Sequence, residues 1–135
     1  MKITKCLVAC DLNPTYLEFY PLVRKYWKNI VGIDTILILI ADEIPYDLKE
    51  FSDEIILFKP VENIHTAFQA QCIRILYPSI IGSNENIIIS DMDLIPLNKK
   101  YYIENDMAED ITLQKSYNIS SEDIIDINNI IKDIK

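Results

Sequence analysis

Two carboxylates, Asp91 and Asp93, stand one residue apart directly after the apolar run at residues 87–89. Clustered carboxylates repel one another unless a cation neutralises them, and their oxygens suit Mg²⁺ or Mn²⁺. Side chains two residues apart on a straight strand point to opposite faces, so these two converge only if the chain turns. Pro96 favours a turn after Ser90. The pair therefore predicts a divalent cation that bridges to a diphosphate.

The D-x-D triplet is also compatible with other kinds of site. In a chain this rich in aspartate the triplet also arises in exposed loops. A calcium-binding EF-hand loop needs glycine at its sixth position, which is Pro96 here. A phosphatase of the haloacid dehalogenase type would carry its D-x-D after the first strand, whereas Asp93 lies in the last third of the chain.

The composition narrows the class of protein. The chain has 135 residues, of which 50% are hydrophobic and 25% charged, which predicts a folded domain with a real core. The two glycines, Gly32 and Gly82, cannot form a glycine-rich phosphate loop. The net charge is −8 and the basic residues form no cluster larger than Lys99 and Lys100, so we expect no nucleic-acid partner.

The cysteines and the apolar runs bear on the compartment. Cys6, Cys10 and Cys72 are odd in number and lack metal-ligand spacing, which predicts buried thiols in a reducing compartment. The apolar run at residues 6–10 is too short for a signal peptide, and the run at 36–41 is too short to span a bilayer. We therefore expect a soluble, cytoplasmic protein without a membrane span.

Apolar periodicity predicts the order strand, helix, strand, strand, helix, strand. The strands are expected at residues 5–10, 35–40, 54–58 and 86–90, and the helices at residues 15–30 and 64–81. Pro21 predicts a kink or a late start in the first helix, in which Trp27 should be buried, and Gly32 and Gly82 should end the two helices. His65 should lie exposed at the start of the second helix. The residues expected to form the buried face of that helix are Ile64, Phe68, Cys72, Ile75 and Leu76.

This order predicts an α/β fold, with a mostly parallel, doubly wound, Rossmann-like sheet flanked by helices. Ligands of such sheets bind beyond the carboxyl ends of the strands. The polar residues that follow the strands should converge there, namely Asp11 and Asn13, Asp42 and Glu43, and Asp91 and Asp93. We expect residues 1–103 to form this core. Residues 104–135 should form an acidic extension of the same domain, with a helix at residues 121–134.

The stretch IIISDMDLIPLNKKYY (residues 87–102) resembles the D-x-D region of nucleotide-sugar glycosyltransferases of the GT-A fold. The stretch ACDLNPTYLEFYPLVRKYW (residues 9–27) is similar to the first strand, nucleotide-side loop and first helix of that family. TAFQAQCIRILYPS (residues 66–79) is similar to the helix before the D-x-D strand, where a Gln and an Arg are common. The resemblance covers about residues 5–103 and is closest in character to compact glycosyltransferases of large DNA viruses.

The resemblance implies roles for the residues around the D-x-D motif. Asp93 would be the main ligand of Mn²⁺ or Mg²⁺, and Asp91 would bind the ribose, or the metal through water. Arg74 would reach the diphosphate or a carboxylate of the site, or else bridge surface acids. Gln71 lies three residues before Arg74, so the two share a helix face.

The resemblance also implies a nucleotide-binding group. Asp11 and Asn13 would lie near the nucleotide, and Asp42 or Glu43 would contact the base or the ribose. Each assignment has a structural alternative, because Asn13 is also a natural turn residue before Pro14, and Asp42 and Glu43 are also natural solvated loop charges.

The implied function is metal-dependent transfer of a sugar from a UDP- or GDP-linked donor to a hydroxyl of a glycan or another acceptor. Family members continue well beyond D-x-D, so the acceptor half is expected to be short or missing here, and no catalytic base is assigned. One alternative is a non-catalytic remnant that binds nucleotide sugar or serves as a scaffold. A weaker one is a metal-dependent phosphodiesterase or nucleotidyltransferase.

Overall fold

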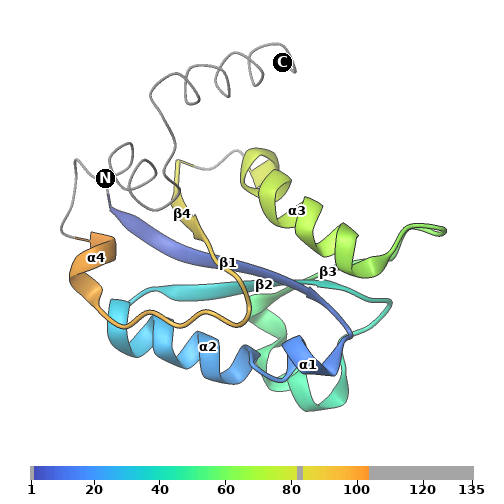
Figure 1. The fold of residues 1–135 in the computed structure, drawn as a ribbon, viewed down its shortest axis with the longest axis horizontal. Coiled ribbons are helices and arrows are strands. Elements are labelled where there is room, and N and C mark those ends of the chain that lie inside the picture. The colour runs from blue at the N-terminus through green and yellow to red at the C-terminus, as the bar shows by residue number, and fades with distance from the viewer. Residues whose placement is uncertain (1, 82–83, 104–135) are drawn as a thin grey trace, which may run out of the picture. The chain divides into compact units, whose positions relative to one another are not determined.

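The computed structural model describes residues 2–81 and 84–103, which belong to the first of two units of the chain, Met1–Ile103. Four parallel strands form one sheet in the order β3-β2-β1-β4, with helices on both faces (Figure 1). The strands are β1 (Ile3–Asp11), β2 (Asp34–Ile40), β3 (Ile55–Phe58) and β4 (Asn86–Ile89). The α/β class and the four predicted strands are confirmed. Predictions for residues 82–83 and 104–135 lie outside the described residues.

The helices are α1 (Pro14–Leu17), α2 (Tyr20–Tyr26), the π-helical turn η1 (Trp27–Val31), the 3₁₀ helix η2 (Tyr46–Glu54), α3 (Thr66–Ile81) and α4 (Lys99–Ile103). The sequence did not predict η2 and α4. The helix expected at residues 15–30 is three consecutive pieces, and Pro21 lies in the first turn of α2, where its missing N–H is tolerated. Gly32 ends η1 at φ +86°, as predicted. None of the described helices is both long enough and apolar enough to cross a membrane.

The core has two parts, one on each face of the sheet (Figure 1). On one face, α2 and η1 contribute the fully buried Tyr20 and Trp27, which confirms the prediction for Trp27, and η2 adds Leu48. On the other face, α3 packs against β1 and β2. Strand β2 is covered on both sides, so its apolar run without alternation is explained.

The connections place a topological switch point between β1 and β4. The segments that join β1 to β2 and β2 to β3 lie on one face, and α3, which joins β3 to β4, lies on the other (Figure 1). The chain therefore runs outward from β1 to β3 and returns to the opposite side of β1. In open α/β sheets ligands bind where the strand order reverses in this way.

The predicted buried face of the second helix is wrong. Helix α3 turns Ala70, Ile73 and Tyr77 toward the sheet. The residues expected to be buried are instead largely exposed, namely Ile64 (46%), Phe68 (58%), Ile75 (66%) and Leu76 (56%), and Cys72 is half-buried. The physical reason is that α3 carries apolar side chains all round, so their spacing alone does not identify the packed side.

Glu54 ties η2 to α2. Its Oε2 accepts hydrogen bonds from the Tyr20 hydroxyl at 2.9 Å and from Arg24 Nε at 2.6 Å, and its Oε1 pairs with Arg24 Nη2. The Arg24 guanidinium also lies 4.8 Å from the centroid of the Phe51 ring. Burial alone would raise the pKa of Glu54, but the hydrogen bonds from Arg24 and Tyr20 and the charge of Arg24 outweigh it, so the pKa is lowered from its ordinary value of 4.5.

The orientation of α3 predicts different costs for two isoleucines on that helix. Ile73→Ala should lower the free energy of unfolding by about 2 kcal/mol, because it removes apolar contacts between α3 and the sheet. Ile75→Ala should change it by less than about 0.5 kcal/mol, because Ile75 is mostly exposed. Urea unfolding followed by circular dichroism measures both values. Equal costs at the two positions would contradict the orientation of α3.

The Glu54 cluster predicts a pH-dependent contribution to stability. Because the pKa of Glu54 is lowered in the folded state, its stabilisation is present above about pH 4.5 and is lost as the pH falls through the folded-state pKa. Glu54→Gln should therefore cost roughly 1–3 kcal/mol at pH 7, and progressively less as the pH is lowered below 4.5. Glu50→Gln, at an exposed acid of the same helix, is the matched control and should be neutral in urea titrations at both pH values.

Candidate functional site

The site begins where β4 leaves the sheet. Strand β1 pairs with β2 as far as Asp11, opposite Ile40, but its pairing with β4 ends at Leu7, opposite Ile89. The Ser90 N–H donates to Leu7 O at 3.0 Å, and the chain then turns away. Among the described residues no strand pairs with the last part of β1 on that side. An opening is left at the carboxyl end of the sheet, at the switch point.

This opening is a pocket of about 350 Å³, here called the switch-point pocket. It is formed by the end of β1, the start of α1, the first half of α3 and the turn after β4. The lining residues are Ala9, Cys10, Asp11, Tyr16, Ala67, Ala70, Gln71, Arg74, Asp91, Met92 and Asp93. The pocket therefore brings together Asp11, Gln71, Arg74 and both aspartates of the D-x-D motif, all of them candidates from the sequence.

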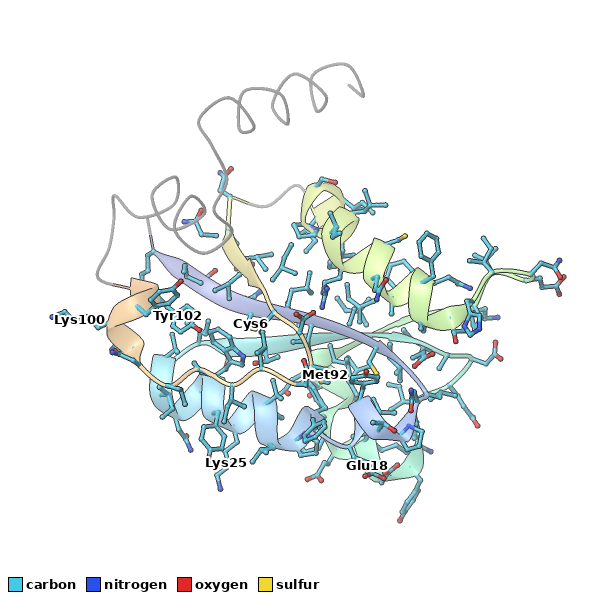
Figure 2. The ribbon with its side chains drawn as sticks, viewed as in Figure 1. Cys6, Glu18, Lys25, Met92, Lys100 and Tyr102 are labelled. Atoms are coloured by element: carbon cyan, nitrogen blue, oxygen red, sulfur yellow. The ribbon has the colours of Figure 1, made fainter. Side chains whose placement is uncertain are left out.

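Asp91 and Asp93 share this pocket because the chain turns between them. The Leu94 N–H donates to Asp91 O at 3.3 Å and closes the turn, which confirms the turn expected after Ser90. Met92, between them, packs into the core and is only 4% exposed (Figure 2). With Met92 buried, both carboxylates are exposed and line the same opening.

Arg74 meets the D-x-D motif from α3. Its Nη1 donates to the Asp91 carboxylate and lies 3.4 Å from the backbone oxygen of Ser90. The sequence left open whether Arg74 reaches the diphosphate, reaches a carboxylate of the site, or bridges surface acids. In the structure it contacts Asp91, a carboxylate of the D-x-D motif. Gln71 lines the same pocket from the same helix face, as expected. This ion pair is half in solvent, because the Asp91 side chain is 54% exposed and that of Arg74 21%.

Asp11 is held by two hydrogen bonds. Its Oδ1 accepts from the Asn13 N–H at 3.0 Å, and its Oδ2 accepts from the Thr66 hydroxyl at 2.7 Å. The Asn13 side chain in turn accepts from the Thr15 N–H at 3.1 Å and caps α1. Asn13 therefore has the structural role before Pro14 that the sequence offered as an alternative to nucleotide binding. Thr66 did not emerge from the sequence as a site residue. Thr66 is the first residue of α3, the helix that leads back to the switch point, and this position could have identified it from the sequence.

A second pocket of about 320 Å³ lies at the carboxyl ends of β1 and β2, and we call it the Asp42 pocket. It is lined by Asp11, Leu12, Asn13, Ile40, Ala41, Asp42, Pro60 and Thr66. Asp11 and Thr66 thus stand beside each other at this pocket, and Asp11 lines both pockets. The candidates Asn13 and Asp42 are brought together here, whereas Glu43 lines neither of the two pockets.

Cys10 lines the switch-point pocket without adding a nucleophile. Burial, followed by the charge of Asp11, raises the pKa of its thiol to about 12, so the sulfur stays protonated. Cys6 is also buried and Cys72 is half-buried, and all three thiols are free. Tyr16, which the sequence did not single out, lies at the mouth of the pocket and is 47% exposed.

The donor atoms of the pocket fit a divalent cation that brings its own further ligands. Within the described residues no group of three or more His, Cys, Asp or Glu side chains forms a ready-made metal site. Mg²⁺ and Mn²⁺ commonly use one or two carboxylates and complete their shell with water and phosphate oxygens. Asp91 and Asp93 would be the two carboxylates in such a mode of binding.

Other polar residues raised by the sequence lie away from the pockets. Lys100 lies far from Met92 (Figure 2), on helix α4, where Tyr102 packs against Trp27 with ring centroids 5.0 Å apart. Lys99 and Lys100 are exposed and line neither pocket. They are therefore a pair of solvated surface charges. His65 is exposed just before α3, as predicted.

Comparisons with protein families, with curated proteins and with solved structures found no match to this chain. A function must therefore be inferred from the residues around the two pockets. Together, the fold and the site define an α/β protein with a charged pocket at the switch point of a parallel sheet.

The contact between Thr66 and Asp11 can be tested through stability. Thr66→Val keeps the shape of the side chain but removes the hydroxyl that binds Asp11, and should lower the free energy of unfolding by about 1 kcal/mol. Thr66→Ser should retain most of the stability, since it keeps the hydroxyl. Thr15→Val is a control, because Thr15 is exposed and binds Asn13 only through its backbone. Equal losses in the Val and Ser variants of Thr66 would show that the hydroxyl contributes nothing.

Proposed function

We propose that this protein is a metal-dependent glycosyltransferase of the GT-A type, which takes a sugar from a nucleotide-diphosphate donor. The observation that carries the proposal is the set of charges in the switch-point pocket, with three carboxylates and one guanidinium at the carboxyl edge of a parallel sheet. Such a mixed set suits a cation–diphosphate complex, because carboxylates bind the cation and a guanidinium binds phosphate oxygens.

The two pockets suggest how the donor lies. The Asp42 pocket is lined by four apolar and four polar residues, the polar ones being Asp11, Asn13, Asp42 and Thr66, and no cationic side chain of the described residues lines it. Apolar walls with a few hydrogen-bond acceptors suit a base and a ribose, which present flat surfaces, N–H groups and hydroxyls. We therefore assign the nucleoside to the Asp42 pocket and the diphosphate to the switch-point pocket. Asp11 lines both pockets and would lie beside the junction of the two parts.

Asp93 and Asp91 are the residues proposed to hold Mn²⁺ or Mg²⁺. When bound, the cation would neutralise the charge that gathers on the diphosphate as the bond to the sugar breaks. Gln71 lines the same pocket and offers an amide that both donates and accepts hydrogen bonds, which suits a sugar hydroxyl. The donor would be linked to UDP or GDP, and the acceptor would be a hydroxyl of a glycan or a similar molecule.

Calorimetry with UDP and GDP, with and without Mn²⁺, tests the proposal. We expect binding that requires Mn²⁺ and that Asp93→Asn weakens at least tenfold, because the cation loses a charged ligand. Asp53→Asn removes the same charge from an exposed position on η2 and should bind like the wild type.

Three outcomes of these measurements are possible. If the wild type binds neither nucleotide, in the presence or the absence of Mn²⁺, the proposal is wrong. If it binds them, release of free sugar from a UDP- or GDP-linked donor in the same buffer would identify an active transferase. Binding without any such release would identify a protein that only holds the nucleotide sugar.

A further inference from the structure

Arg74 uses little of its hydrogen-bonding capacity. A guanidinium carries five N–H donors in a fixed planar fork. Here Nη1 contacts Asp91 and Ser90, whereas Nε is buried and has no partner among the described residues. Arg74 lines the switch-point pocket, and a further acceptor there could satisfy the Nε donor once the guanidinium turns toward it.

The charges around Arg74 affect a cation and a diphosphate in opposite ways. A cation that approaches Asp91 and Asp93 meets a positive guanidinium and finds one carboxylate already paired. A diphosphate that approaches alone meets the carboxylates of Asp11, Asp91 and Asp93. Each ligand is therefore disfavoured singly, and each removes the obstacle to the other.

We propose that Arg74 is the internal counterion of this site and makes the binding of cation and diphosphate interdependent. Without ligands its guanidinium neutralises Asp91. When cation and diphosphate enter together, the cation takes its place beside Asp91 and the guanidinium transfers to phosphate oxygens. This inference rests on the proposed function and adds the reason why the two ligands bind as one.

The exchange is favourable because the pair to be broken is weak. An ion pair with a partner more than half in solvent contributes little, and Asp91 is 54% exposed. A phosphate accepts two parallel bonds from a guanidinium and so holds it more strongly than one exposed carboxylate does.

Only the side chain of Arg74 has to move. The start of α3 is fixed by the bond from Thr66 to Asp11, and by Gln69, which donates to Val61 O at 3.0 Å and to Ile64 O at 2.8 Å. The backbone that carries Arg74 is therefore held in place while its guanidinium changes partner.

The test is to titrate Mn²⁺ alone, and then UDP and GDP in the presence of Mn²⁺, into the wild type and into Arg74→Gln. The variant should bind Mn²⁺ alone at least threefold more tightly, because Asp91 is released and a positive charge is gone. It should bind the nucleotide with Mn²⁺ at least tenfold more weakly, because the phosphate loses its partner. Arg74→Met, which keeps the apolar stem of the side chain, should give the same two opposite shifts.

Two further variants separate charge from structure. Lys5→Gln makes the same change in net charge and breaks the 3.0 Å ion pair with Glu85 at the start of β1, so both affinities should stay at their wild-type values. Arg74→Lys keeps the positive charge and should leave the affinity for Mn²⁺ alone within twofold of the wild type. Thermal unfolding of every variant shows which of them are folded.

The outcomes separate this inference from the proposed function. If the wild type binds no nucleotide with Mn²⁺, the proposed function fails and the inference fails with it. If the wild type binds nucleotide, but both affinities of Arg74→Gln fall together or neither changes, only the inference is overturned. Arg74 would then be a residue that merely holds the turn after β4 in place.

Discussion

The site depends on the different lengths over which β1 pairs with its two neighbours. Strand β2 accompanies β1 to Asp11, whereas β4 leaves it at Leu7. If β4 continued beside β1, its side chains would occupy the space that now forms the switch-point pocket. The early departure also lets the chain turn at once, which is how two carboxylates separated by one residue come to share one opening. Met92, buried at the centre of that turn, fixes it to the core.

The charges of the pocket are held by elements that cannot move far. Asp11 ends the central strand and is bonded to Asn13 and Thr66, and Arg74 stands on a helix packed against the sheet. Positions of this kind keep polar groups in place at little cost when a ligand arrives. The high pKa of Cys10 removes one competing source of negative charge from the same opening. What remains is a pocket in which three carboxylates outnumber one guanidinium.

The sequence predicted the strands and the convergence of Asp11, Asp91 and Asp93 because both follow from local rules. Apolar, β-branched runs form buried strands, and the ends of parallel strands meet at one edge. The shared face of Gln71 and Arg74 likewise follows from helical spacing. The contact of Thr66 with Asp11 depends instead on where α3 sits above the sheet, which spacing does not determine. For the same reason the buried side of α3 was not predicted correctly.

Helix α3 carries apolar side chains on every side, so burial of apolar surface alone does not determine which side faces the sheet. Rotated by half a turn about its axis, the helix would turn Phe68 and Ile75, which are exposed in the structure, toward the sheet instead of Ile73 and Tyr77. Only the observed rotation lets Thr66 reach Asp11 and Arg74 reach Asp91. The hydrogen bond from Thr66 to Asp11, with a smaller contribution from the exposed Arg74–Asp91 pair, therefore favours one angular setting of the helix. The same few polar side chains thus line the switch-point pocket and bind helix α3 in its observed orientation.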